Sequence, residues 1–318
     1  MAWEIVGEIG ASSESAGSLH SPVMAAEVLQ WLRPRSGGFY VDCTVGYCGH
    51  ALAILTSSQP NGILLGIDRD LQAVDSCRQR LRAFGERVWL VKAHFMELKT
   101  TLMQRGIQRV DGVLFDLGVS SPQLDEASRG FSFRSDGPLD MRMDQSGGPT
   151  AADIVNGVDE GRLADMIYRL GEERYSRRIA RAIVGARRLR AFTATNQLTA
   201  VIESAVPAHY RRGRIHCATR TFQALRITVN GELDHLEASL RDAADVLAPG
   251  ARLCVISFHS LEDRIVKHTF KSLAAQGSEL DILTKRPQMP SEDELNRNPR
   301  SRSAKLRVLQ RLMKEGHA

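Results

Sequence analysis

The most informative segment is Asp111-Gly-Val-Leu-Phe-Asp-Leu-Gly-Val-Ser-Ser-Pro-Gln-Leu-Asp125, in which an apolar run ends abruptly at Asp116. Such a run, bounded by glycines, predicts a buried strand of a parallel sheet, and these sheets bind ligands outside the carboxyl ends of their strands. We therefore expect Asp116 to lie where a ligand binds. An Asp that merely caps the following turn explains this segment equally well, so the other strands must decide.

Two earlier segments follow the same plan. The first is Gly38-Phe-Tyr-Val-Asp-Cys-Thr-Val-Gly-Tyr-Cys-Gly-His50, which predicts a strand, a glycine loop and a helix that begins near Ala51. Glycines let the backbone approach a ligand closely, and the amides of the following helix point toward it. The second is Gly62-Ile-Leu-Leu-Gly-Ile-Asp68. Its terminal acid follows the loop at roughly the 20-residue spacing at which a carboxylate takes the ribose hydroxyls of an adenosine cofactor.

The glycine loop distinguishes between adenosine cofactors. A dinucleotide fingerprint needs G-x-G-x-x-G, because backbone amides must reach a pyrophosphate. The string Gly46-Tyr-Cys-Gly-His-Ala51 breaks that pattern. S-adenosylmethionine carries no phosphate, so one or two glycines suffice for its methionine end. The loop therefore favours methyl transfer over nicotinamide-dependent oxidoreduction.

These strings also resemble those of a known family. Further strings that carry the resemblance are His20-Ser-Pro-Val-Met24, Ile67-Asp-Arg-Asp70, Arg129-Gly-Phe-Ser-Phe133, Asp136-Gly-Pro-Leu-Asp-Met-Arg-Met-Asp144, Ala218-Thr-Arg-Thr-Phe-Gln-Ala-Leu-Arg226, Ser257-Phe-His-Ser-Leu-Glu-Asp-Arg264 and Asn298-Pro-Arg-Ser-Arg-Ser-Ala-Lys-Leu-Arg307. Together they resemble the cytosine-N4 methyltransferases of small-subunit ribosomal RNA, the MraW or RsmH family. The resemblance implies a class I S-adenosylmethionine-dependent methyltransferase that methylates N4 of a cytidine in the decoding centre of 16S ribosomal RNA. Its partner would be that RNA or the assembled small ribosomal subunit.

The resemblance also implies which residues contact the cofactor. They are Cys48, Gly49, His50, Asp68, Phe95, Asp116 and Gln123. Asp68 would take the ribose hydroxyls, Phe95 would pack against the adenine, and the backbone of residues 48–50 would hold the methionine end. From the residues alone, Phe95 is more often an ordinary core residue and His50 more often a helix cap or surface residue.

Cys48 departs from the family, which usually has glycine at this position. If Cys48 must adopt a positive φ, the conformation costs on the order of 1 kcal/mol. Its side chain is then expected to occupy space near the methionine carboxylate, which would lower affinity without abolishing activity. This departure also motivates an alternative function, a non-catalytic RNA-binding relative.

Methylation of a cytosine amine sets the chemical requirements of the site. The amine shares its lone pair with the ring, so it is a poor nucleophile and must be held in line with the sulfonium methyl. An acceptor for an amine hydrogen would assist the attack and take the released proton. Asp116 is the catalytic candidate. Many amino-methyltransferases have Asp/Asn-Pro-Pro-aromatic here, whereas this chain has Asp116-Leu-Gly-Val-Ser-Ser-Pro122, so the assignment of a general base stays open.

Basic residues suggest how RNA is held. The formal net charge is +5 and the pI about 9.1, which suits a polyanionic partner but is also common on other proteins. On a helix, one face would carry Arg174, Arg177, Arg178 and Arg181. We expect Arg177, Arg178 and Arg181 to contact RNA phosphates. The alternative is a solvated face paired with Glu172 and Glu173.

A second substrate-side segment follows a strand that ends at Phe258. There, His259 and Arg264 are expected to donate hydrogen bonds to the base or to phosphate. A helix that opens at Ser260 with acids in its first turn explains part of the same string.

The pattern predicts one methyltransferase core split by an insertion. Residues 20–125 and 221–318 form the core, and residues 126–220 form a helical domain expected to bind RNA. Residues 11–18 are small and polar, which predicts that residues 1–19 form a flexible tail.

Within the core, the sequence predicts several elements beyond the three strands. Ser21 and Pro22 are expected to open a helix. A leucine-striped helix over residues 233–247 should end at Pro249-Gly250, before a buried strand over residues 253–258. Residues 282–284 and 305–310 are expected to form an edge hairpin.

The five cysteines include no C-x-x-C pair, so we expect neither a metal site nor a disulfide framework. This cysteine usage is typical of a protein in a reducing compartment. The N-terminus resembles no secretory leader, and no apolar run is long enough to span a membrane. We therefore expect a soluble cytoplasmic protein without a membrane partner. The sequence leaves open whether it forms a homodimer.

Overall fold

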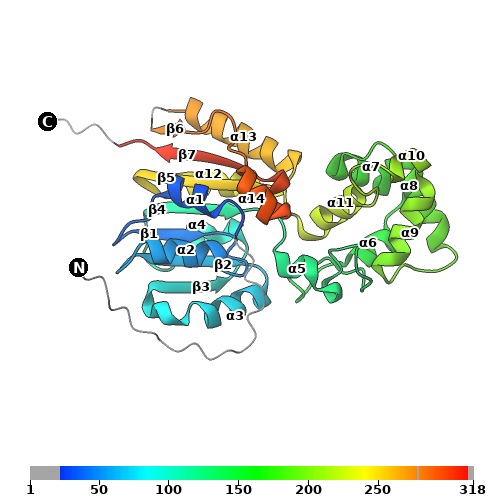
Figure 1. The fold of residues 1–318 in the computed structure, drawn as a ribbon, viewed down its shortest axis with the longest axis horizontal. Helices are drawn as coiled ribbons and strands as arrows, with labels where there is room; N and C mark the ends of the chain where they lie inside the picture. The colour runs from blue at the N-terminus through cyan, green and yellow to red at the C-terminus, as the bar shows by residue number, and fades with distance from the viewer. Residues whose placement is uncertain (1–21, 278, 314–318) are drawn as a thin grey trace, which may run out of the picture.

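The computed structural model describes residues 22–277 and 279–313 of the 318-residue chain. An α/β layer and a helical unit lie next to each other along the long axis of the molecule (Figure 1). The tail predicted over residues 1–19 and the cap predicted at Ser21 lie outside the described residues.

The described residues contain one seven-stranded sheet. Its strands are β1 (Phe39–Asp42), β2 (Ile63–Asp68), β3 (Val88–Lys92), β4 (Val110–Asp116), β5 (Leu247–Ser257), β6 (Leu280–Ile282) and β7 (Lys305–Arg311). They lie in the order β3-β2-β1-β4-β5-β7-β6, in which β1 to β5 are parallel and β7 is antiparallel to both its neighbours. The strand order reverses between β1 and β4, so the sheet is doubly wound. The predicted Rossmann-like sheet is confirmed. The terminal hairpin is also present, but its first strand is Leu280–Ile282 rather than residues 282–284.

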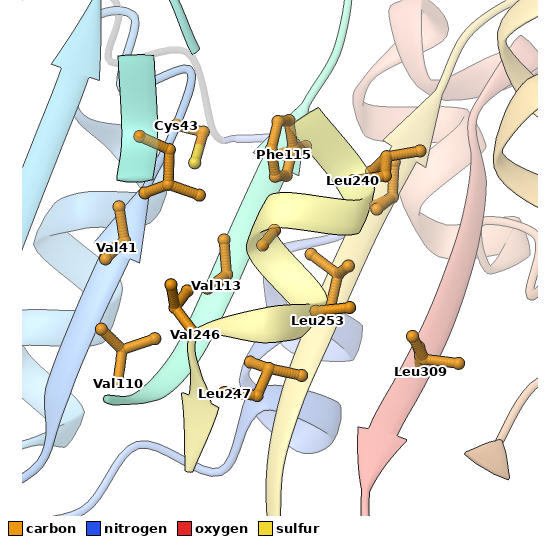
Figure 2. Packing of buried hydrophobic residues seen from close by; sticks show 14 of the residues in the cluster. Val41, Cys43, Val110, Val113, Phe115, Leu240, Val246, Leu247, Leu253 and Leu309 are labelled. Carbon is orange, nitrogen blue, oxygen red and sulfur yellow. The ribbon is translucent and has the colours of Figure 1, made fainter. Parts of the chain in front are cut away.

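Helices cover both faces of the sheet. One face carries α1 (Ala25–Leu32), α2 (Gly49–Ser57) and α3 (Leu71–Arg80), and the other carries α4 (Leu98–Met103), α12 (Leu236–Asp245) and α13 (Ser260–Ala275). Alternate residues of β4 serve the two layers: Val113 and Phe115 pack on the α12 side, and Leu114 packs on the α2 side. Figure 2 shows Val113 and Phe115 on β4, in the same apolar cluster as Leu240 of α12. Burial on both faces explains why these strands are continuous apolar runs.

Three details differ from the sequence prediction. β3 was not predicted, because it ends at Lys92 whereas the prediction followed strands that end in an acid. The first helix begins at Ala25 rather than at Pro22, after Met24 in a left-handed conformation with φ of 56°. The leucine-rich helix ends at Asp245. Leu247 pairs instead with Val110 in the sheet, so strand pairing overrides the helical periodicity.

Between β4 and α12 the chain builds the helical unit. Its helices are α5 (Ser121–Asp125), α6 (Ala151–Gly157), α7 (Glu160–Gly171), α8 (Ser176–Arg187), α9 (Thr195–Ala205), α10 (Ala208–Arg211) and α11 (Thr219–Asn230). This unit has its own apolar core, to which Ile167, Ile183 and Phe222 contribute. α11 packs on α7 and leads back to the sheet (Figure 1). The apolar core of this unit is therefore distinct from those on the two faces of the sheet.

Shorter elements complete the described chain. They are α14 (Glu292–Arg297), between β6 and β7, and four 3₁₀ turns, η1 (Arg82–Arg87), η2 (Phe95–Glu97), η3 (Ala127–Arg129) and η4 (Pro299–Ser303). Among the described residues, none of the helices combines the length and apolarity needed to cross a membrane.

Candidate active site

A cavity of about 700 Å³ opens at the carboxyl ends of the parallel strands, next to the point where the strand order reverses. Its wall contains six of the seven residues predicted to contact the cofactor, namely Gly49, His50, Asp68, Phe95, Asp116 and Gln123. Separate strands and loops thus deliver these side chains to one space, as the strand-end pattern predicts.

Asp68 organises the glycine loop. One of its carboxylate oxygens accepts the backbone N–H of Gly46 at 2.8 Å, and the other accepts that of Asp70 at 2.9 Å. Burial raises the pKa of Asp68 to about 6, although these two hydrogen bonds oppose the shift. Each oxygen keeps a second lone pair, so the carboxylate can also accept hydrogens from a pair of ligand hydroxyls.

Cys48 precedes α2 with φ of 61°, so the expected left-handed conformation is present. Its side chain, however, is buried in the core beside Cys77 and is not part of the cavity wall. The expectation that this side chain crowds the methionine end is therefore wrong. Cys48 belongs instead to the apolar cluster that also contains Ala51 of α2 and Cys77 of α3.

His50 and Asp116 form a buried pair at the cavity. The His50 Nε2 atom lies 3.5 Å from the Asp116 carboxylate, and only 4% of His50 is exposed. Burial acts against a charged imidazole, but the Asp116 and Asp42 carboxylates outweigh it and raise the pKa of His50. Among the described residues, neither ring nitrogen of His50 has a hydrogen-bond partner, and the same holds for the Asp116 Oδ1 atom. Burial raises the pKa of the neighbouring Asp42 to about 7.

Phe95 provides an aromatic part of the wall. Its ring lies 4.1 Å from that of His94 and packs edge-on against Phe115, with centroids 5.8 Å apart. Burial lowers the pKa of His94 to about 4, so this imidazole is neutral at physiological pH. Flat, uncharged surfaces of this kind suit a planar heterocycle.

Gln123 is held by a buried network that the sequence did not reveal. Its amide nitrogen donates to the Asp70 carboxylate at 2.8 Å, and its carbonyl accepts the backbone N–H of Ser120 at 3.0 Å. Asp70 also accepts from Arg129 at 2.8 Å, and only 2% of Arg129 is exposed. This ion pair joins the end of β2 to the first part of the helical unit. Both residues lie in the strings that carry the family resemblance, which is the only sequence signal for them.

The cavity wall nearest α13 is polar and charged. Arg226 donates to both carboxylate oxygens of Glu232, at 2.9 and 2.8 Å. Burial would raise the pKa of the neighbouring Glu262, but His259 and Arg226 outweigh it and lower the pKa. His259 is not on the wall itself; its Nδ1 accepts the Glu262 backbone N–H and its Nε2 lies 3.1 Å from the Glu262 carboxylate. His259 therefore orients Glu262, which does line the cavity.

The same three side chains have the donor types of a metal site. Ligand atoms of Glu232, His259 and Glu262 lie within 4.8 Å of one another. The guanidinium of Arg226, however, already neutralises Glu232 at close range. A divalent cation would have to compete with that fixed positive charge, so the group is better described as an ion-pair network.

Arg264 lies between the sheet and the helical unit rather than on the cavity wall. Its guanidinium pairs with Glu172 at 3.1 Å, and the Ser260 hydroxyl donates to the same carboxylate at 2.5 Å. Asp144 makes a second bridge, to Lys92 of β3, at 3.1 Å. These exposed pairs contribute to how the two parts sit against each other.

The arginines predicted to contact RNA lie on α8. Arg177, Arg178 and Arg181 are exposed on this helix, but Arg174 precedes it. The prediction that all four arginines lie on one helix face is therefore wrong for Arg174.

The neighbouring acids do not pair with this face. Glu172 pairs with Arg264, and Glu173 accepts the Tyr210 hydroxyl. In the described part of the chain, Arg181 is the member of this face that forms an ion pair, at 3.6 Å from Glu160. The alternative of a face laced to Glu172 and Glu173 is therefore not what the described residues show.

Comparison with known proteins identifies the family. The family model described as the MraW methylase family matches residues 17–312. This chain belongs to that family. It is 51% identical over 306 residues to the ribosomal RNA small subunit methyltransferase H of Syntrophobacter fumaroxidans, covering 92% of this chain and 96% of that protein. It is 50% identical over 304 residues to the protein of the same name from Synechococcus elongatus, covering 96% and 98%.

Solved structures with a similar arrangement are more distant in sequence. TrmN from Thermus thermophilus is 12% identical with a TM-score of 0.41, over 91% of this chain and 48% of that one. The O-methyltransferase from Bacillus cereus in complex with SAH is 5% identical with a TM-score of 0.41, over 86% and 73%.

As a member of the MraW methylase family, the chain uses S-adenosylmethionine as its cofactor. The cavity fits this molecule. The Asp68 carboxylate has lone pairs available to hydroxyls, Phe95 offers an aromatic surface, and the glycine loop leaves room beside α2. A Cβ at Gly49 would lie 2.9 Å from Pro22, so this position requires glycine for the loop to pack closely.

Proposed function

We propose that this methylase transfers the methyl group of S-adenosylmethionine to N4 of a cytidine in small-subunit ribosomal RNA, at the decoding centre. The observation that carries the proposal is the unpartnered Oδ1 atom of Asp116, buried at the end of β4 in the same cavity as Asp68. The relatives, which are named ribosomal RNA small subunit methyltransferase H, support small-subunit ribosomal RNA as the substrate. Cytidine and the decoding centre rest on the resemblance of the sequence strings.

We assign the cofactor contacts by what each residue offers. Asp68 takes the ribose hydroxyls, Phe95 packs on the adenine, and the backbone at Gly49 holds the methionine end. Gln123 fixes the segment after β4 through Asp70. S-adenosylmethionine supplies an electrophilic methyl group on its sulfonium.

Asp116 then acts on the cytosine amine. Its Oδ1 accepts one amine hydrogen, which raises the electron density on nitrogen and holds the amine in place. The attack makes that nitrogen strongly acidic, so a carboxylate is a sufficient proton acceptor. The neighbouring His50 Nε2 atom lies 3.5 Å from the Asp116 carboxylate, on the wall of the same cavity. Positioning and a modest base are then enough for transfer.

The charged wall near α13 would bind the rest of the base. Glu262, oriented by His259, presents an acceptor, and Arg226 presents a half-buried guanidinium that is fixed by Glu232. Arg264 lies between the sheet and the helical unit, and its guanidinium would donate hydrogen bonds to the RNA from there. The RNA-binding insertion predicted over residues 126–220 extends through α11, which packs in the same core, and Arg177, Arg178 and Arg181 would contact phosphates from it.

The test is transfer of label from radioactive S-adenosylmethionine to small ribosomal subunits that lack the modification. Digestion to nucleosides is expected to place the label in N4-methylcytidine. Cofactor binding without transfer would instead support the non-catalytic alternative. Subunits that already carry the modification serve as the control and should accept no label.

A further inference from the structure

A second, smaller pocket lies between α7 and α8, in the helical unit. Its volume is about 230 Å³, and its wall consists of Asp165, Tyr168, Arg174, Tyr175, Ser176, Arg177 and Arg178. None of these residues lines the cofactor cavity. α8 lies at the end of the molecule that faces away from the sheet (Figure 1). Seven residues of a short segment thus bring two tyrosines, three arginines and one acid to one small space.

Part of this pocket is rigid before any ligand binds. The Arg174 guanidinium lies 4.9 Å from the ring centroids of both Tyr175 and Tyr210. The two rings meet edge-on, with centroids 4.8 Å apart. Glu173, which is 0% exposed, accepts the Tyr210 hydroxyl at 2.5 Å and the Tyr175 backbone N–H at 2.8 Å. A buried acid therefore fixes an aromatic and cationic platform, which lowers the entropy cost of binding to it.

The rest of the pocket is open to solvent. The Tyr168 side chain is 61% exposed, although an aromatic ring gains from burial. Arg177 and Arg178 are exposed at the start of α8. By contrast, Arg162 and Arg181 of the same two helices lie against Asp159 and Glu160. The exposed aromatic ring and the neighbouring cations are placed to meet a partner that is flat and anionic.

An unpaired nucleotide has this chemistry. Aromatic rings and guanidinium planes stack nucleobases, and exposed arginines bind the phosphates that flank them. Asp165 adds a preference, because a carboxylate accepts hydrogens from the exocyclic amines of cytosine, adenine or guanine, and uracil has none. At about 30 Å³ for each water in the liquid, a pocket of about 230 Å³ has room for a small ring system and not for a folded RNA element.

We propose that the α7–α8 pocket binds one unpaired, amine-bearing nucleotide of the RNA substrate, stacked on Tyr168 and Tyr175 with its phosphate on Arg177. The inference rests on the proposed function and deepens it. The bound nucleotide is not the one that is methylated, because the pocket and the cofactor cavity share no residues. It is a neighbouring nucleotide, and its capture helps set which cytidine reaches Asp116.

Photocrosslinking of the full chain tests the site directly. The probe is a short single-stranded oligoribonucleotide with one 5-iodocytidine, and mass spectrometry maps the modified peptide. We expect crosslinks at Tyr168 or Tyr175, fewer with 5-iodouridine in the same position, and a loss of crosslinking at this pocket in Tyr168→Ala. Crosslinks that map only outside residues 165–178 would overturn the proposal. Leu189→Ala is the matched control, because Leu189 is 92% exposed in the same unit and away from the pocket.

Binding measurements separate this proposal from the proposed function. Stacking contributes enough per base that Tyr168→Ala should weaken RNA binding by ~5- to ~150-fold, with cofactor affinity unchanged. Tyr168→Trp should restore binding, because it restores a stacking surface. If the wild type methylates small subunits and Tyr168→Ala binds RNA as tightly as the wild type, the pocket proposal fails and the function stands. If the wild type transfers no methyl group to ribosomal RNA, the function fails whatever the pocket binds.

Discussion

The carboxylate of Asp68 gives the prediction that the structure defines most fully. Asp68→Asn keeps the size of the side chain but removes its charge and one of its two acceptor atoms. In the wild type, one oxygen accepts from Gly46 and the other from Asp70, so the amide nitrogen of asparagine must face one of these two backbone donors. The loop loses one anchor, and the ribose loses a charged acceptor.

The size of the effect follows from these contacts. A hydrogen bond to a charged group contributes roughly 1.5–3 kcal/mol. Since about 1.4 kcal/mol corresponds to a factor of ten, the dissociation constant for S-adenosylmethionine should rise by ~10- to ~150-fold. Isothermal titration calorimetry measures it, with Asp75→Asn as the control, because Asp75 is exposed on α3 and pairs only at the surface with Arg78.

The same residue predicts a pH dependence. Burial raises the pKa of Asp68 from 3.8 to about 6, so the carboxyl is protonated in the folded chain below that pH and loses its negative acceptor. Affinity for the cofactor should therefore fall as the pH drops through about 6, and Asp68→Asn should flatten that fall. The stability of the folded chain changes with pH in the opposite direction to cofactor affinity. The unfolded chain ionises first, so the free energy of unfolding decreases as the pH rises from about 4 to 6. Equal affinities of wild type and Asp68→Asn at pH 7.5 would refute this reasoning.

Three further predictions concern chemistry, RNA and the loop. Asp116→Ala should lower the rate of methyl transfer by ~10²- to ~10⁴-fold with little change in melting temperature. Normal turnover of labelled cofactor by this variant would mean that Asp116 takes no part in the reaction. Replacing Arg177, Arg178 and Arg181 together by glutamine should weaken binding of the RNA substrate and reduce the slope of log K against log salt by about three, with cofactor affinity intact. An unchanged slope in a salt titration would mean that these three arginines face solvent and do not contact RNA phosphates. Cys48→Gly should leave cofactor affinity within about twofold, because its side chain is off the cavity wall and only ~1 kcal/mol of backbone strain is relieved. A large gain in titrated affinity would mean that the thiol does crowd the cofactor.

The strand-end residues could be predicted because their signals are local. An apolar run that stops at Asp68 or Asp116 encodes both the strand and the end at which the acid lies. Parallel pairing then brings those ends to one edge, so the cavity follows from the sequence.

Long-range pairing could not be read in the same way. The Arg129–Asp70 and Arg264–Glu172 ion pairs depend on how the helical unit packs on the sheet, and no periodicity encodes that. The direction of the Cys48 side chain depends on its φ and on Cys77, a residue 29 positions later in the sequence. Tertiary packing decided each of these details.

The central claim is that Asp116 faces a cytosine amine at the methyl donor. The most direct measurement is nucleoside-resolved mass spectrometry of small-subunit ribosomal RNA after incubation with S-adenosylmethionine and either the wild type or Asp116→Ala. The account predicts N4-methylcytidine at a single position with the wild type, and at least a hundredfold slower accumulation with the variant. A methyl group found on carbon 5, on the ribose or on another base, or the same rate with Asp116→Ala, would contradict it.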